Sequence, residues 1–542
     1  MESKREAHPF AGSAEQDLNV QLQRSYDEMP YRSVAFAETD LDHLRTVAHL
    51  FGLSAPPAQT ARVLEIGCAS GGNLIPMALR YPQARFAGLD LSLKQVEQGR
   101  AQVAALGLKN VDIHHVDVRR VKLKPGNLDY IICHGVFSWV PPEVQRGILR
   151  LCGASLAPGG VAYISYNTYP GWKGREILRD AMLLRAGGRR TPAERLGYAR
   201  GMLDFLQQTA APGSLVRQVV DDNMAGLRSA SNDYLLHEYL ESCNQPFYLR
   251  SFVEQAQAQG LVYLGDAHPS TMFAYNHGAE VAEPLLQEVS DQVSLEQYLD
   301  FVTGRSFRST LLVRADSASG LRYDVMPERM ASLHVAGRFT PAGGVAGEAA
   351  AGGAAPQGAW QDWRGMAVQQ AQDVLSQALM QAMSQAWPST LSVPVLRDAS
   401  AAALQQPGLT LEAVCQALLP LWVAGHVRAR TVPVLCDRPT ADVVRLSPKA
   451  FVDGDRVVTA WHQSVPLSDL AQAVLTCLRK GPVARAALLQ YCLAQVVSGA
   501  LQLLDGGVTV EWTSDPSRAS TLLAHELDIL LQDMQDLGLL TS

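Results

Sequence analysis

Apolar runs of strand length recur along the first third of the chain, and each ends in a polar or glycine-containing turn. The runs occupy 62–65, 84–90, 111–115, 128–133 and 161–165. Helix-like stretches separate them: 73–81 follows the first run, and Pro142 stands where a helix after the fourth run would begin. Strands that alternate with helices predict an α/β fold built on a parallel sheet.

The pattern is helical from 173 to about 245 and then becomes strand-like again. Residues 191–194 (Thr-Pro-Ala-Glu) form a capping box with proline at the first helical position. Later elements are a helix at 251–256, a helix capped at 294–297, and strands at 260–265 and 309–313. Because the strands resume only after 245, we interpret 173–245 as a helical insertion within a seven-stranded domain.

Helical spacing also marks one segment ahead of the sheet and several beyond it. A helix from about Asp40 that ends at Gly52 is expected to cover one side of the first strand. Residues 340–358 are rich in Gly and Ala and are typical of a flexible linker. Beyond the linker, helices at 363–387 and 411–424 and a short strand that reaches Arg430 are typical of a winged helix, and a second helical group spans about 465–542.

The turn after the first run has the spacing Glu65-x-Gly67-x-x-x-Gly71. Glycine lets the backbone turn tightly and approach a ligand where a Cβ would clash. The three-glycine dinucleotide motif is absent, and so is the Lys-Ser/Thr pair of a phosphate-binding P-loop. A purely structural strand-to-helix turn is the alternative interpretation.

The second run ends in Asp90, where a carboxylate of a mononucleotide-binding unit accepts hydrogen bonds from ribose hydroxyls. Together the strand ends resemble those of class I S-adenosylmethionine (SAM) methyltransferases. The resemblance implies that Asp117 faces the adenine amino group and that SAM is the cofactor. The residues that it assigns to the cofactor are Glu65, Gly67, Cys68, Gly71, Asn73, Asp90, Leu91, Asp117, Val118 and His134.

The methyl acceptor is expected beside 166–172, directly after the fifth run. Ligands of parallel α/β sheets bind outside the carboxyl ends of the strands. We therefore take Tyr166, Asn167, Tyr31 and His134 as candidates that position the acceptor. A Pro-Gly turn with surface aromatics is the alternative. No metal is expected, since His114 and His115 would point to opposite faces of a strand.

Composition narrows the class of protein. The net charge of -7 argues against broad binding to nucleic acid or anionic membranes. The 8 cysteines have no Cys-x-x-Cys spacing, which favours reduced, buried thiols. No apolar run reaches the roughly 20 residues of a membrane span, and the first residues lack the apolar core of a signal peptide. The cytoplasm is the expected compartment.

More of the chain resembles the class I methyltransferases that carry a methyltransferase regulatory domain, a family that includes bacterial protein-lysine methyltransferases acting on an outer-membrane protein. The matching stretches are 26–31, 65–73, 166–172, 296–301, 307–312 and Trp461-His462. The resemblance implies a final antiparallel strand in the sheet, and appended dimerisation, middle and C-terminal domains. The 340–358 stretch and the weakly patterned tail depart from the family.

The expected architecture is a seven-stranded Rossmann-like methyltransferase domain with a helical insertion and a C-terminal winged-helix-like α+β region. Its boundaries are a SAM-binding core at 1–172, the insertion at 173–245 for self-association or acceptor docking, the rest of the catalytic core and regulatory region at 246–335, a linker at 340–360 and the C-terminal region at 361–542. A homodimer is one expected assembly.

Three functions remain open. The first is N-methylation of protein lysines, the second is methylation of a small molecule or cell-envelope metabolite, and the third is SAM-binding regulation without catalysis. The large appended regions favour a protein substrate. The complete set of cofactor residues argues against the third function. A lysine acceptor has an unperturbed pKa near 10.4 and must lose a proton, which desolvation alone favours, so no dedicated base is expected.

Overall fold

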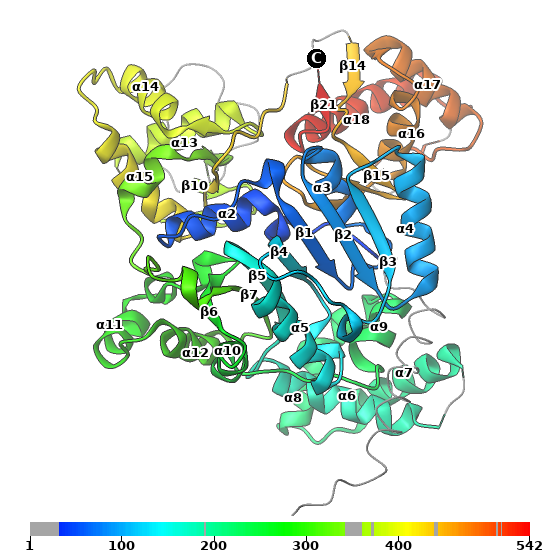
Figure 1. Cartoon of the computed structure of the whole chain (residues 1–542). Coiled ribbons are helices and arrows are strands. Elements are labelled where there is room, and N and C mark those ends of the chain that lie inside the picture. Colours follow the sequence, from blue (N-terminus) through cyan, green and yellow to red (C-terminus); the bar gives the residue numbers. More distant parts are fainter. Residues whose placement is uncertain are drawn as a thin grey trace, which may run out of the picture. The chain divides into compact units, whose positions relative to one another are not determined.

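The computed structural model describes residues 32–188, 191–341, 360–369, 373–437, 443–505, 508–510 and 512–541. The chain divides into two compact units (Figure 1). The first unit holds the chain through Val34 and then Leu53–Tyr323, and the second holds Ala35–Gly52 and the chain from Asp324 onward. Tyr31 and the greater part of the expected linker, 342–359, lie outside the described residues.

A seven-stranded sheet with the order β3-β2-β1-β4-β5-β7-β6 forms the centre of the first unit. Its strands are β1 (Arg62–Ile66), β2 (Arg85–Asp90), β3 (Val111–His115), β4 (Leu128–Cys133), β5 (Leu156–Asn167), β6 (Leu261–Asp266) and β7 (Phe307–Arg314). Strands β1 to β5 pair in parallel, whereas β7 runs antiparallel to both β5 and β6. The expected α/β sheet with a final antiparallel strand is confirmed.

Helices pack against this sheet as the strand-helix alternation predicts. The helices of the first unit outside the insertion are α3 (Leu74–Arg80), α4 (Leu93–Ala105), α5 (Pro142–Ser155), α10 (Leu249–Gln257), α11 (Ala279–Glu288) and α12 (Gln292–Thr303). Helices α3 and α4 contact β2 and β3, α5 contacts β5, and α10 contacts β6 and α12. Helix α12 begins earlier than expected, because its N-cap is Asp291 and not Ser294. The Asp291 carboxylate accepts a hydrogen bond from the Ser294 backbone N–H.

Short 3₁₀ turns join several of these elements in the first unit. They are η2 (Ala58–Thr60), η3 (Val118–Arg120), η4 (Phe137–Trp139), η5 (Pro269–Thr271), η6 (Ala274–His277) and η7 (Ala315–Ser317). Two of them, η3 and η4, follow β3 and β4 at the carboxyl ends of the parallel strands. Their placement brings side chains from these loops to the edge where the site is expected.

The insertion consists of α6 (Trp172–Ala186), α7 (Pro192–Thr209), α8 (Leu215–Ser229) and α9 (Asn232–Tyr239). These helices bury a hydrophobic cluster of their own, which includes Leu178, Leu203 and Leu236. The Thr191–Glu194 capping box forms as expected. Figure 1 shows the four helices at the end of the sheet to which the parallel strands point. The chain returns to that end at Phe247, which bridges Thr168.

The second unit corrects the expectation for the helix that starts near Asp40. Helix α2 (Leu41–Leu50) belongs to the second unit rather than to the unit of the first strand, and it contacts β13 (Arg428–Arg430) and η8 (Pro327–Ser332). The Asp42 carboxylate anchors it by accepting from the backbone N–H groups of Thr431, at 2.9 Å, and Val432, at 3.2 Å. The apolar face of α2 was readable from the sequence, but its distant partner was not.

The middle part of the second unit contains three helices, α13 (Val374–Ala386), α14 (Val393–Leu404) and α15 (Leu411–Val423). The helix expected at 363–387 begins only at Val374, because Trp360–Asp362 and Ala367–Val368 form the hairpin β10–β11, whose turn holds Gly365 at φ 76°. The remaining elements are η1 (Ala37–Thr39), β8 (His334–Ala336), β9 (Phe339–Pro341) and β12 (Leu391–Ser392). The expected Thr410 cap on α15 is present.

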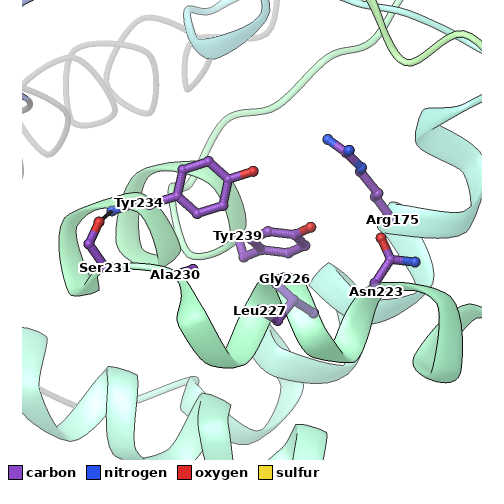
Figure 2. A pocket seen from close by; sticks show the side chains of 8 residues that line it. All are labelled: Arg175, Asn223, Gly226, Leu227, Ala230, Ser231, Tyr234 and Tyr239. Carbon is purple, nitrogen blue, oxygen red and sulfur yellow. Dashed lines mark hydrogen bonds between the residues drawn. The ribbon is translucent and has the colours of Figure 1, made fainter. Parts of the chain in front are cut away.

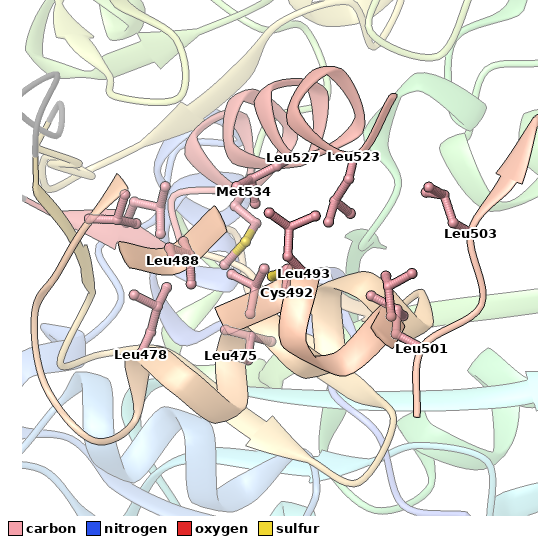
Figure 3. Packing of buried hydrophobic residues seen from close by; sticks show 14 of the residues in the cluster. Leu475, Leu478, Leu488, Cys492, Leu493, Leu501, Leu503, Leu523, Leu527 and Met534 are labelled. Atoms are coloured by element: carbon pink, nitrogen blue, oxygen red, sulfur yellow. The ribbon is translucent and has the colours of Figure 1, made fainter. Parts of the chain in front are cut away.

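The C-terminal part packs α16 (Asp469–Leu478), α17 (Arg485–Val497) and α18 (Pro516–Asp536) around buried leucines, among them Leu475, Leu488 and Leu527 (Figure 3). Its strands are β14 (Val443–Leu446), β15 (Phe451–Asp453), β16 (Arg456–Val458), β17 (Ser464–Pro466), β18 (Val483–Ala484), β19 (Leu504–Asp505), β20 (Val508–Thr509) and β21 (Leu540–Thr541). Among the described helices, none is both long enough and apolar enough to cross a membrane.

Candidate active site

The turn between β1 and α3 is held against the end of β2. Gly67 and Gly71 have φ of 72° and 83°, a region that favours glycine. The backbone N–H groups of Gly67 and Cys68 both donate to the Leu89 carbonyl, at 2.7 and 3.1 Å. A Cβ added to Gly67 would overlap the Cγ2 of Val136. The glycines are therefore required by the fold of the turn, which presents its backbone at the carboxyl end of β1.

Glu65 lies buried beneath this turn with one carboxylate oxygen unsatisfied. Its Oε1 accepts from Asn73 Nδ2 at 2.9 Å, whereas its buried Oε2 has no hydrogen-bond partner among the described residues. Burial raises the pKa of Glu65 to about 8, against the opposing effect of the Asn73 hydrogen bond. An unsatisfied buried acceptor in this place fits a cationic ligand group such as the ammonium of SAM, so the residues present suit that cofactor.

Asp90, at the end of β2, faces the same turn. Its Oδ2 accepts from the Ala69 backbone N–H and its Oδ1 from the Ser92 backbone N–H, both at 2.8 Å. Burial raises the pKa of Asp90 above its ordinary value, although these backbone donors oppose the shift. Each carboxylate oxygen keeps a further lone pair, which leaves Asp90 able to accept from ribose hydroxyls. The neighbouring Leu91 carbonyl contacts His115 Nε2 at 3.0 Å.

Asp117 and Val118 lie where β3 passes into η3, and Asp117 caps that turn. Its carboxylate forms a two-pronged ion pair with Arg119, with an Nη2–Oδ2 distance of 2.6 Å. Partial burial alone would raise the pKa of Asp117, but the Arg119 hydrogen bonds outweigh it and hold the pKa below its ordinary value. The expected contact with adenine stays a prediction, and it would have to share this carboxylate with Arg119.

His134 follows β4 and is half-buried between two aromatic side chains. Its Nδ1 lies 2.8 Å from the Tyr163 hydroxyl, and its ring stands 6.0 Å from that of Phe307 in an edge-on arrangement. Burial lowers the pKa of His134 to about 3. The imidazole is therefore neutral near pH 7 and is too weak a base to take a proton from an amine.

Tyr166 and Asn167 end on opposite faces of β5, because successive strand residues alternate. The Tyr166 side chain is 1% exposed, stacks on Phe252 and shares a 2.9 Å hydrogen bond with Thr310 Oγ1. Tyr166 is therefore a core residue here, and its expected part in positioning the acceptor stays a prediction. Asn167 of β5 lies opposite Phe307 of the neighbouring strand β7, on the face of the sheet that carries His134. Its Nδ2 donates a hydrogen bond to Asn244 Oδ1 at 3.0 Å.

Two serines that the sequence patterns did not single out hold this face together. Ser165 Oγ accepts from the Gly135 backbone N–H at 2.8 Å, and Ser138 Oγ accepts from the Asn167 backbone N–H at 2.9 Å. They tie the loop after β4 to the end of β5. Serine carries little signal in a single sequence, and only the strand-end position of Ser165 could have suggested a role.

A buried ion cluster fills the opposite face near β7. Arg308 is fully buried and bonds Asp300 at 2.8 Å, Glu296 at 3.0 Å and Asp266 at 3.5 Å. The Tyr263 hydroxyl also donates to Glu296, at 2.7 Å. Glu296, Asp300 and Arg308 belong to the stretches 296–301 and 307–312, which resemble the family but had no role assigned from the sequence. The structure assigns them to the framework that holds β6, β7 and α12 together.

The Trp461-His462 stretch lies in the second unit. Trp461 is 2% exposed, stacks on Trp387 at 5.9 Å and donates its Nε1 hydrogen to the Pro388 carbonyl at 3.2 Å. This stretch therefore has a packing role within its own unit. Within the described parts of the chain, no group of three or more His, Cys, Asp or Glu side chains is arranged to hold a metal ion.

Family models match three parts of the chain. One described as "Methyltransferase domain" matches 63–160, one described as "Predicted methyltransferase regulatory domain" matches 231–314, and one described as "PKMT, C-terminal winged helix domain" matches 437–539. The first covers β1 to β4 with the cofactor turn, and the second contains the Arg308 cluster. The third places the winged helix in the C-terminal part, beyond the 363–430 stretch where the pattern had suggested one.

Several known proteins are similar to the chain. Uncharacterized protein RP789 of Rickettsia prowazekii is 43% identical over 54% of this chain and 53% of its own length, so the match spans about half of that relative. Uncharacterized protein RP028 of the same organism is 36% identical over 43% of this chain and 94% of its own length.

Solved structures of PKMT2 from Rickettsia typhi share the fold. The structure without a named ligand has a TM-score of 0.79 at 24% identity and covers 94% of this chain and 100% of its own. The complex with AdoHcy has a TM-score of 0.80 at 24% identity and covers 95% of this chain and 100% of its own. With the three family models and the match to nearly all of RP028, this chain belongs to the class I SAM-dependent methyltransferases that carry a methyltransferase regulatory domain and a C-terminal winged helix.

Proposed function

We propose that the protein transfers the methyl group of SAM to the side-chain amine of lysine in a protein substrate. The observation that carries this proposal is the match of 437–539 to the PKMT winged-helix family in a chain whose first unit holds a SAM-type site. The cofactor supplies an activated methyl group, so the protein has to bind it, orient the amine and exclude water.

The acceptor lies, in this proposal, on the β5 face that carries His134, Phe307 and Asn167. The Phe307 side chain is 39% exposed beside His134 and offers an apolar wall to the aliphatic stem of lysine. The Asn167 amide oxygen accepts no hydrogen bond from the described residues and is available to hold an amine N–H. Because His134 is neutral near pH 7, it does not repel a lysine ammonium, and loss of water favours release of the lysine proton.

The direct test follows label from methyl-labelled SAM into a native cell lysate. Wild-type protein should place the label in protein, and Asp90→Ala should place much less at a SAM concentration near the wild-type Kd, since that variant lacks the carboxylate expected to bind the ribose. Label that enters only small molecules would reject a protein substrate and support the metabolite alternative. Asn167→Ala should lower kcat at an unchanged SAM affinity measured by calorimetry.

We further propose that the protein self-associates through the insertion. Apolar side chains on α6, α7 and α8 face solvent: Leu184 is 80% exposed, Phe205 51% and Leu215 64%. Exposed apolar side chains gathered on one subdomain often mark a protein interface. Sedimentation should show a dimer that Leu184→Glu dissociates.

The eight described cysteines form no disulfide, which supports the cytoplasm as the working compartment.

A further inference from the structure

A pocket opens between α6, α8 and α9 of the insertion, with a volume of about 390 Å³. It is lined by Arg175, Asn223, Gly226, Leu227, Ala230, Ser231, Tyr234 and Tyr239 (Figure 2). This volume lies within the range of pockets that hold a small ligand or a few side chains of a partner. None of its lining residues is among the cofactor residues described above.

Polar groups without partners converge on this pocket. Figure 2 shows the Arg175 guanidinium facing the hydroxyl groups of Tyr234 and Tyr239 across the opening. Within the described residues, Arg175 forms no hydrogen bond or ion pair, and neither hydroxyl is hydrogen-bonded. By contrast Arg179, one helical turn further along α6, is 7% exposed and donates to the backbone carbonyls of Tyr239 and Glu241. Arg179 is structural, whereas Arg175 is free to bind a ligand.

The electrostatic setting of the pocket favours an anion. Arg175 is half-buried, and its charge acts on the Glu238 carboxyl of α9. Loss of water around the Glu238 carboxyl raises its pKa to about 7, although Arg175 opposes the shift. Glu238 therefore carries less than a full negative charge near neutral pH, and it forms no ion pair with Arg175 among the described residues. An arginine fork with two hydroxyl donors beside it matches the geometry of a carboxylate.

The pocket lies close to the carboxyl ends of β4 and β5. Trp139, in η4 directly after β4, packs against Trp172 at 6.1 Å between ring centroids. Trp172 begins α6 after β5, and its ring stands 6.4 Å from Tyr239 and 5.8 Å from the Arg175 guanidinium. An extended peptide advances about 3.3 Å per residue. About four residues would therefore span the distance from the loop after β4 to the pocket.

We propose that this pocket binds an acidic side chain of the protein substrate a few residues from the lysine that is methylated. Arg175 pairs with the carboxylate, the Tyr234 and Tyr239 hydroxyls donate to it, and Leu227 packs against the aliphatic stem. The proposal rests on the proposed function, since it assumes a protein substrate. It adds what the substrate sequence must contain.

The test uses a synthetic peptide library with one central lysine and six randomised, lysine-free positions on each side, incubated with SAM and the full-length protein. Mass spectrometry of methylated members should show Asp and Glu enriched at one or two fixed positions for the wild-type protein. Arg175→Met should abolish the enrichment and lower kcat/KM at least tenfold for enriched peptides, with SAM affinity unchanged. Arg175→Glu should shift the preference from Asp and Glu to Arg, because the randomised positions contain no lysine.

Control variants separate this role from effects on folding. Arg228→Met changes an α8 arginine that pairs with Asp204 outside the pocket, and it should keep the enrichment. Tyr234→Phe removes one hydroxyl and should weaken the acidic preference without a change in melting temperature.

Each contrary outcome has a distinct meaning. If the wild-type protein methylates library lysines without acidic enrichment, or if Arg175→Met keeps it, the pocket proposal is overturned and the proposed function stands. If no lysine of the library or of a lysate is methylated, the proposed function fails and the pocket proposal falls with it. If Arg175→Glu dissociates a dimer, the pocket belongs to an interface between two copies of the chain and the proposal is likewise overturned.

Discussion

Arg308 and Arg175 both belong to the first unit, but their surroundings are opposite. Arg308 is fully buried and meets three carboxylates. Arg175 faces a pocket and, among the described residues, pairs with none. Buried charges are costly unless they are paired, so the fold has to satisfy Arg308 internally. Charges that the protein pairs internally thus build its framework, and charges that it leaves unpaired indicate where ligands bind.

The same contrast separates two carboxylates of the sheet. Asp266 accepts from Arg305 at 2.9 Å and, despite its burial, its pKa is held below the ordinary value by Arg305 and Arg308. Glu65 has a buried oxygen without a partner in the described residues, and its pKa is raised to about 8. Asp266 belongs to the framework, whereas Glu65 lies beneath the turn after β1, where we expect its unpartnered oxygen to meet a cationic group of the cofactor.

The largest effect is expected from Arg308→Met. The substitution leaves three carboxylates buried without their cation and should lower the free energy of unfolding by about 3–5 kcal/mol. Arg175→Met should change it by no more than about 0.5 kcal/mol, as is usual where no internal partner is lost. Urea denaturation of both variants measures the difference. Equal losses would show that the two arginines are not distinguished by their partners.

The next largest effect is expected from Asp90→Ala, on cofactor binding. Charge-assisted hydrogen bonds contribute about 1.5–3 kcal/mol each, so the loss of the ribose contacts should weaken SAM more than tenfold in calorimetry. Asp117→Asn should weaken SAM binding less than Asp90→Ala does, because the Asp117 carboxylate is already paired with Arg119. An unchanged SAM affinity of the Asp90→Ala variant would show that Asp90 does not bind the cofactor.

A smaller effect separates two glycines with similar backbone conformations. Gly67 has φ 72° and Gly107 has φ 66°, so alanine at either position costs about 1 kcal/mol of strain. A Cβ at Gly107 meets nothing within 4 Å, whereas at Gly67 it meets Val136. Gly67→Ala should therefore lose more stability than Gly107→Ala and also lose SAM affinity. Matching melting temperatures and affinities would mean that the turn can adjust.

The smallest effect is a proton released on cofactor binding. With a pKa raised from 4.5 to about 8, Glu65 keeps its proton at pH 7 in the free protein. Its contribution to stability is complete below pH 4.5 and is lost as the pH rises through 8. A cationic group at Oε2 favours the ionised carboxylate, so SAM should bind more tightly as the pH rises toward 8. Calorimetry of SAM binding in buffers of different ionisation enthalpy should detect the released proton. SAM binding to the Glu65→Gln variant should release no proton from this position.

Local features of the site were predictable from the sequence, and features set by distant partners were not. Glu65, Gly67 and Asp90 could be placed at the carboxyl edge of the sheet because each lies at the end of a strand or in the turn that follows it. Tyr166 could not be oriented, since the pairing of β5 with β7 turns it toward Thr310 and the core. Helix α2 showed its apolar face in the sequence, but Thr431, which holds it in the second unit, is far away along the chain.

The position of lysine methylation tests the central claim most directly. The full-length protein is incubated with SAM that carries a deuterated methyl group and with a native lysate, and labelled residues are located by mass spectrometry. The account predicts the heavy methyl on lysine Nζ atoms, at the wild-type level with Gly107→Ala and at a much lower level with Asp90→Ala. Label on other residue types, on small molecules only, or equally abundant with Asp90→Ala would contradict it.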